Sequence, residues 1–131
     1  MQYLTTQINT SATIVGAAGA QINEGAFLAA KFDGDGNIVP CSAKGEAAVG
    51  IIIPTNDNAI LAGADVDVQV MYMGLWKAGE AFAAGAALTT DARGRAVAAA
   101  SGDDVLAQAL EASAADGNVV SIQITKAGKL A

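Results

Sequence analysis

The strongest constraint on the fold of this chain is an internal repeat. The segment KFDGDGNIVPCSAKGEAAVGI at residues 31–51 aligns with TTDARGRAVAAASGDDVLAQA at residues 89–109, with strand and turn signals in the same order. Residues 64–70 likewise match residues 116–124, where a turn containing aspartate leads into an alternating strand. Self-similarity of this kind indicates one structural unit encoded twice. The sequence therefore predicts two copies of one β unit.

Alternation of apolar and polar residues predicts that these units are built from strands. The alternation holds over residues 63–76 and again over 118–125, as expected of half-buried strands. The DGDG turn at 33–36 predicts a hairpin, because Asp-Gly readily adopts the positive φ angles of a tight turn. On the strand at 63–76, one face is predicted to carry Val66, Val68, Val70 and Tyr72 toward the core, and the other to carry Asp67, Gln69, Met71 and Met73.

The predicted fold class is all-β and mainly antiparallel, with little helix. Residues 103–116 fit either a helix or a strand followed by a turn, and residues 78–99 are predicted to be a turn, a strand and a hairpin. Short strands at regular spacing with turns between them indicate a small β-barrel or a β-sandwich. We expect a single β domain over residues 24–131, with the two units at about 25–76 and 77–125.

Residues 1–23 are predicted to form an extended N-terminal arm followed by a first strand. No charged side chain occurs before Glu24, and Tyr3, Leu4 and Ile8 stand among Thr, Gln, Asn and Ser. Such a segment is either a frayed terminus or an arm that adds a strand to a partner through main-chain hydrogen bonds. On the second interpretation, Tyr3, Leu4 and Ile8 reach a neighbouring subunit or another partner protein.

Charge and composition argue against several classes of function. The net charge is −6, and the seven basic residues are not clustered, so nucleic acid is not an expected partner. No segment has the length of apolar sequence that spans a bilayer, and no targeting signal is evident. The chain has no histidine, which removes the commonest general base and zinc ligand. The lone Cys41 is predicted to be a small core residue.

No motif predicts catalysis, a metal site or a cofactor. Asp33, Asp35 and Asn37 have the spacing of the first calcium ligands of an EF-hand loop. The glycine expected next is Ile38, however, and the glutamate expected at the twelfth position is Lys44. A hairpin turn is the favoured interpretation of DGDGN. We therefore predict that the protein is not an enzyme.

Large apolar residues fall on both faces of the predicted strand at 63–76. Met71, Met73 and Leu75 lie opposite the valine face, and Trp76 continues that face at the end of the strand. Either a second core layer or another subunit would cover them. We predict that Met71, Met73 and Trp76 help to form an interface with another subunit or a partner protein.

The chain resembles, most clearly in its second half, the capsid cement, or head decoration, proteins of tailed bacteriophages that have a DUF2190-like domain. The matching motifs run from VDVQVMYMGLWKAGEAFAAGAALTTDARGRAVAAA to GDDVLAQALEASAADGNVVSIQI, and the resemblance covers about residues 25–125. It implies a non-enzymatic virion protein without cofactors, made in the host bacterial cytoplasm. It also implies binding to the major capsid protein on the outer capsid surface, with the chain as a homotrimer at three-fold or quasi-three-fold sites.

A second hypothesis is a head-fibre or adhesin-type module that binds host surface glycans. Such a module needs exposed aromatic platforms, and the chain has only one Trp, two Tyr and three Phe. The cement role therefore remains the leading expectation.

Overall fold

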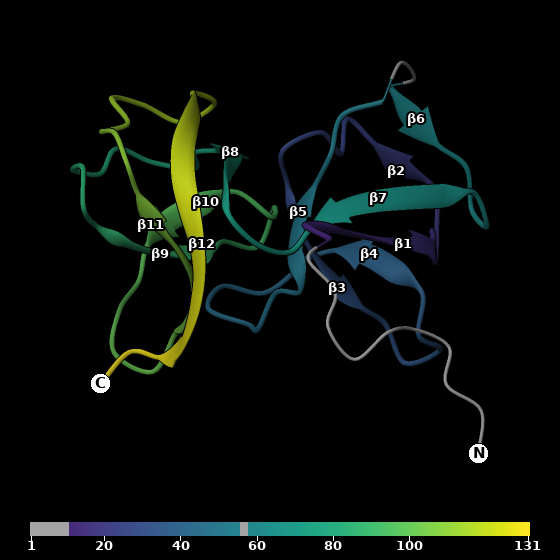
Figure 1. Cartoon of the computed structure of the whole chain (residues 1–131), viewed down its shortest axis with the longest axis horizontal. Coiled ribbons are helices and arrows are strands. Elements are labelled where there is room, and N and C mark those ends of the chain that lie inside the picture. Colours follow the sequence, from purple (N-terminus) through teal and green to yellow (C-terminus); the bar gives the residue numbers. More distant parts are fainter. Residues whose placement is uncertain (1–10, 56–57) are drawn as a thin grey trace.

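The computed structural model describes residues 11–55 and 58–131, and over these residues the chain consists of strands and turns (Figure 1). This confirms the predicted all-β, mainly antiparallel class. Within the described part, no helix is long and apolar enough to cross a membrane. The strands are β1 (Thr13–Ala17), β2 (Ile22–Asn23), β3 (Ala29–Phe32), β4 (Ile38–Pro40), β5 (Gly50–Ile52), β6 (Ala59–Ile60), β7 (Asp65–Gln69), β8 (Met73–Lys77), β9 (Ala87–Thr90), β10 (Ala96–Ala98), β11 (Asp104–Ala109) and β12 (Val119–Lys129).

The internal repeat is a repeat of structure. The strand order is β1-β7-β5-β3-β4 in one five-stranded sheet and β8-β12-β11-β9-β10 in the other. In each sheet, the strand that comes first in the chain (β1 or β8) lies at one edge and pairs with the strand that comes last (β7 or β12). The remaining strands follow in the same order, so the two sheets have the same topology. We call these the first and second units, and Figure 1 shows them side by side. The first unit also carries the small β2-β6 pair.

Each sheet is closed by the residues that follow its first strand. Ala18 forms a parallel bridge with Ile38 in the first unit, and Ala78 forms the equivalent bridge with Ala96 in the second. The next residue is a glycine in both units. A Cβ on Gly19 would lie 2.3 Å from Asp33 Oδ2, and a Cβ on Gly79 would lie 2.5 Å from Asp91 Oδ2. The Ala-Gly pairs of this alanine-rich sequence therefore mark the points where each sheet curls into a small barrel.

The two Asp/Gly turns are also equivalent, and they are hairpin turns. Asp33 Oδ1 accepts hydrogen bonds from the amides of Asp35 and Asn37, both at 2.9 Å. Asp91 Oδ1 accepts the matching bonds from Arg93 and Arg95 at 2.8 and 2.9 Å. These bonds between the aspartate and its own turn are the ones that an Asp/Gly hairpin turn makes. The residues described include no group of acidic or sulfur side chains that could hold a metal ion.

The prediction of one continuous strand over residues 63–76 is wrong. The chain forms β7, bends at residues 70–72 and then begins β8, which belongs to the second sheet. Tyr72 adopts a φ of 71°, which turns the chain out of the first sheet. The chain therefore passes from the first sheet to the second before Met73, and Trp76 already belongs to the second sheet. The open question at 103–116 is settled as strand, because β11 occupies its first half.

The two units pack against each other through the hydrophobic core of the second unit, which includes residues of the first. Ala29, Cys41 and Ile51 of the first unit join the buried cluster around Trp76. The Gly94 carbonyl accepts two hydrogen bonds here, from Ala29 N at 2.8 Å and from Trp76 Nε1 at 2.9 Å. The remaining first-unit core is a separate cluster of seven buried residues: Ala18, Ile22, Ala30, Ile38, Ile52, Val66 and Val68.

Candidate assembly surface

The most prominent apolar surface lies on the segment that joins the two units. Met71, Tyr72, Met73 and Leu75 are all exposed, and Met73 is the most open at 67%. We call these four residues the junction patch. Exposed apolar patches on soluble proteins often mark contact surfaces, so these residues are the candidate contact surface of this chain.

Local hydrogen bonds hold the junction patch in place. The Gln69 side-chain amide donates to the carbonyls of Met71 at 2.9 Å and Met73 at 2.7 Å. Ile124 N donates to the Tyr72 carbonyl at 2.9 Å. Gly74 makes room for this arrangement, because a Cβ there would lie 2.4 Å from Gln69 Oε1. The patch is therefore presented in a fixed conformation, which lowers the conformational entropy cost of binding.

An apolar cleft adjoins the patch. It has a volume of about 280 Å³ and is lined by residues 51–54, Phe27, Gln69, Gly74 and Leu75. The cleft therefore lies between the end of β5 in the first unit and β8 in the second. Small-molecule sites usually occupy about 300–1,000 Å³ and contain convergent polar groups. This cleft is smaller and mainly apolar, so it suits one or two side chains of a protein partner.

One wall of the cleft is an open strand edge. β8 is the edge strand of the second sheet. On the β12 side, the Tyr72 carbonyl accepts a hydrogen bond from Ile124 N, and Ala78 N donates to the Asn118 carbonyl. Alternation in an antiparallel ladder directs the main-chain groups of Met73, Leu75 and Lys77 the other way. Lys77 N confirms this direction, since it donates to the Phe27 carbonyl at 3.0 Å. The edge is thus closed at Lys77 and open at Leu75.

The sequence-predicted contact residues do not all lie at this surface. Met71 and Met73 belong to the junction patch. Trp76 does not, because its side chain has no exposed area and its indole N–H is bound inside the protein. Its predicted role in an interface is therefore corrected: it is a core residue. The predicted contacts of Tyr3, Leu4 and Ile8 lie outside the residues that the structure describes.

Sequence reasoning missed Tyr72 as a surface residue. The period-two pattern placed it with the buried valines, but the bend at residues 70–72 leaves 51% of it exposed. Phe27, which lines the cleft, was also missed, and like Tyr72 it has a positive φ, here 64°. A positive φ at an aromatic residue depends on tertiary contacts and leaves no signal in hydrophobic periodicity.

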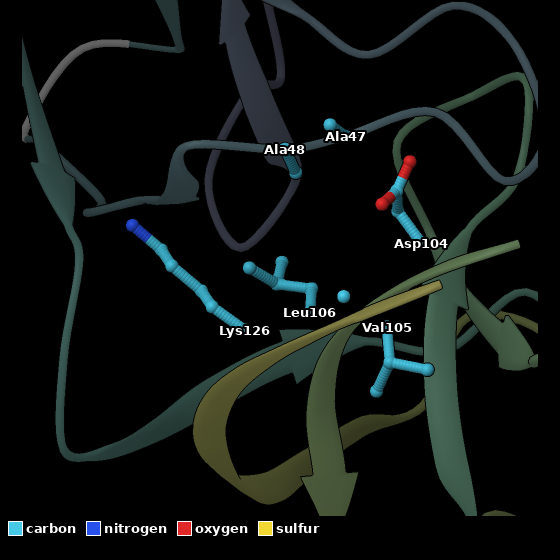
Figure 2. Close-up of a pocket in the computed structure, with 7 residues that line it drawn as sticks. Ala47, Ala48, Asp104, Val105, Leu106 and Lys126 are labelled. Carbon is cyan, nitrogen blue, oxygen red and sulfur yellow. The ribbon is translucent and has the colours of Figure 1, made fainter. Parts of the chain in front are cut away.

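A second hollow of about 120 Å³ lies between the two units, beside residues 47–48 and β11 (Figure 2). Burial lowers the pKa of Lys126, which lines it. Figure 2 shows the Lys126 and Asp104 side chains on opposite sides of Leu106, and Asp104 pairs instead with Lys129 at 3.1 Å. The hollow therefore does not bring an acid and a base together.

Charged groups form ion pairs elsewhere on the described surface, and none of those pairs includes a residue of the junction patch. Hydrogen bonds from Arg93 and Arg95 lower the pKa of Asp116. At Glu46, burial opposes ionisation, but the Lys31 ammonium and two backbone amides outweigh it and lower the pKa. These groups are satisfied by their neighbours, as expected of surface structure rather than of a reactive site.

Cys41 is expected to be unreactive in the folded protein. It is 2% exposed, and burial, aided by the charge of Glu46, raises its pKa to about 12. Because the thiolate is the nucleophile, a thiol reagent at pH 8 should modify the native protein at least ~100-fold more slowly than the chain unfolded in guanidinium. Mass spectrometry of timed reactions would measure both rates, and equal rates would contradict the burial of Cys41.

Comparison with known proteins finds a solved structure with the same fold but does not identify a family. No protein-family model matches the chain, and no curated protein does, so the DUF2190-like resemblance stays a prediction. A solved structure, the head fiber gp8.5 N base in bacteriophage phi29, matches with a TM-score of 0.65 and 20% sequence identity. The match covers 91% of this chain and 97% of that one, so it spans both units. At this identity the likeness is one of fold: the chain has the fold of that head-fiber base.

Proposed function

We propose that this protein is a non-enzymatic structural protein of a bacteriophage head. In this role it binds the outer surface of the assembled head and stabilises contacts between major capsid subunits. The observation that carries the proposal is the match to a phage head-fiber base over nearly the whole of both chains. The resemblance of the second half to capsid cement proteins supports it independently. The proposed location is the virion.

The physical properties of the chain suit this role. The two units share a buried cluster, and the exposed junction patch carries no charge on an acidic protein. A structural protein needs a rigid body and a contact surface rather than a reactive group. We propose that the chain acts as a homotrimer at three-fold or quasi-three-fold positions, because several weak contacts made together dissociate slowly.

The matched structure also favours a second candidate, a head-fibre base that contributes to host binding. Glycan recognition of the kind proposed for adhesins relies on exposed aromatic rings, which present an apolar face to the sugar. Among the described residues, the exposed aromatic side chains are Phe32 and Tyr72, while Trp76 is buried. This surface offers little for a sugar to stack on, so attachment to the head is the better supported function.

Incubation with undecorated heads tests the proposal. Purified protein is mixed with heads assembled from the major capsid protein of the same genome, and the heads are sedimented and imaged by electron microscopy. We expect saturable co-sedimentation and added density at regular positions on the outer surface. The same protein unfolded in urea and diluted onto the heads serves as the control for adhesion. Absence of density at saturating protein, together with binding on a glycan array, would replace the cement role with the adhesin role.

A further inference from the structure

The open edge of β8 and the apolar cleft beside it form a site for an added strand. We propose that this site receives residues 1–10 of a second copy of the chain, so that copies of the protein are joined by exchange of their N-terminal arms. The proposal concerns contacts between copies and does not depend on binding to a phage head. It assigns a specific docking partner to the junction patch.

Main-chain groups at the open edge supply the first part of the argument. Leu75 directs its N–H and C=O away from β12, and among the described residues no partner from the first unit reaches them as Phe27 reaches Lys77. An edge with unpaired main-chain groups and apolar side chains is a template for another strand. Strand addition would satisfy these groups while the cleft takes up alternate side chains of the incoming segment.

The chemistry of residues 1–10 fits the cleft. The junction patch and the cleft lining contain no charged side chain, so a charged segment would lose hydration there without an ionic partner. Residues 1–10 carry no charged side chain and include strand-competent residues, although the chain as a whole is acidic. In an extended segment, Leu4 and Ile8 share one face because side chains alternate with a period of two.

The starting point of the arm is known from β1. Val70 N donates to the Ala12 carbonyl at 2.8 Å, so the chain enters the described fold beside the junction between the units. Ten extended residues span about 33 Å, which is enough to reach a neighbouring subunit.

The pairing of β7 favours a neighbour's cleft over the chain's own. Gln69 is flanked by Thr13 of β1 on one side and by Ile51 of β5 on the other. The arm therefore leaves on the β1 side, while Ile51 and the cleft lie on the β5 side. Docking within one chain would require the arm to turn back over the bend at residues 70–72, so a second copy is the proposed recipient.

Measurement of mass in solution tests the exchange. Four proteins are compared by sedimentation and light scattering over a range of concentrations: the full chain, a chain beginning at Ser11, Leu75→Lys and Leu61→Lys. We expect the full chain to form a closed oligomer of defined mass. The shortened chain and Leu75→Lys should dissociate at a concentration at least ~10-fold higher. Leu61 is exposed on the other unit, so Leu61→Lys is the matched control and should associate like the full chain.

Two outcomes of this comparison would overturn the proposal. The first is a full chain that stays monomeric at the highest concentration, and the second is a shortened chain that associates as strongly as the full one. Circular dichroism of each variant shows whether it is folded, so loss of association is not confused with loss of structure. Neither readout involves a capsid, and failure of head binding is therefore distinguishable from failure of arm exchange.

Disulfide trapping identifies which copy supplies the arm. The variants Leu4→Cys and Leu75→Cys are each purified reduced and then oxidised alone or as a mixture, and Cys41 is buried and unreactive. We expect a covalent dimer containing one of each variant in the mixture. If the mixture gives no such dimer and the double variant forms a disulfide within one chain, the arm docks on its own cleft and the proposal is wrong.

Discussion

Replacing Trp76 with alanine is expected to lower the free energy of unfolding by about 3–5 kcal/mol. Trp76 is the largest fully buried side chain, and it packs in the cluster that joins the two units. The substitution leaves a cavity there and removes the indole hydrogen bond to the Gly94 carbonyl. Urea denaturation followed by circular dichroism measures the change, since the variant has lost the chain's only tryptophan fluorophore.

Two further variants separate the contribution of the indole hydrogen bond from that of side-chain packing and provide a surface control. Trp76→Phe keeps most of the ring but loses the hydrogen bond. Ala29 N still occupies the Gly94 carbonyl, so the expected loss is about 1–2 kcal/mol. Leu61→Ala, at an exposed apolar residue outside both buried clusters, is the matched control and should change stability by less than about 0.5 kcal/mol. A loss below about 1 kcal/mol in Trp76→Ala would return Trp76 to the list of contact residues that the sequence suggested.

The second large effect is expected at Gly50. This residue lies in β5 at the centre of the first sheet, and a Cβ on it would lie 2.1 Å from the Gln69 carbonyl oxygen and 2.8 Å from Val68 Cγ1. Because the nearest atom belongs to the backbone, no side-chain rotation relieves the clash and the strands must separate. Gly50→Ala should therefore lose about 3 kcal/mol or fail to fold.

Gly34→Ala is the matched control for this prediction. Gly34 lies in the turn between β3 and β4, and a Cβ there meets no atom within 4 Å. We expect its stability to stay within about 0.5 kcal/mol of the wild-type value. Denaturation of both variants by urea, followed by the fluorescence of Trp76, provides the comparison. Equal stability of Gly50→Ala and Gly34→Ala would mean that β5 and β7 pack less closely than the structure has them.

The assembly surface was only partly predictable from the sequence. Met71 and Met73 were identified because they stand opposite the valines in a period-two pattern, and both are exposed. The same pattern predicts a buried Tyr72 and a Trp76 in a contact surface. Both predictions fail because the alternation is continued through the bend at residues 70–72. The position of one left-handed residue decides which face each later side chain takes, and nothing in the composition of MYMGLW marks it.

The sequence by itself determined the all-β class, the turns at Asp33 and Asp91 and the presence of two similar units. These depend on local chemistry: side-chain alternation, Asp-Gly turn preferences and repetition of both. The tertiary structure alone decided where one unit ends and the next begins, how Trp76 joins them and where a cleft is left open at β8. These features depend on contacts between residues far apart in the chain, such as Trp76 with Gly94 and Phe27 with Lys77. Local propensity does not encode such pairings, because they form only when the two barrels pack against each other.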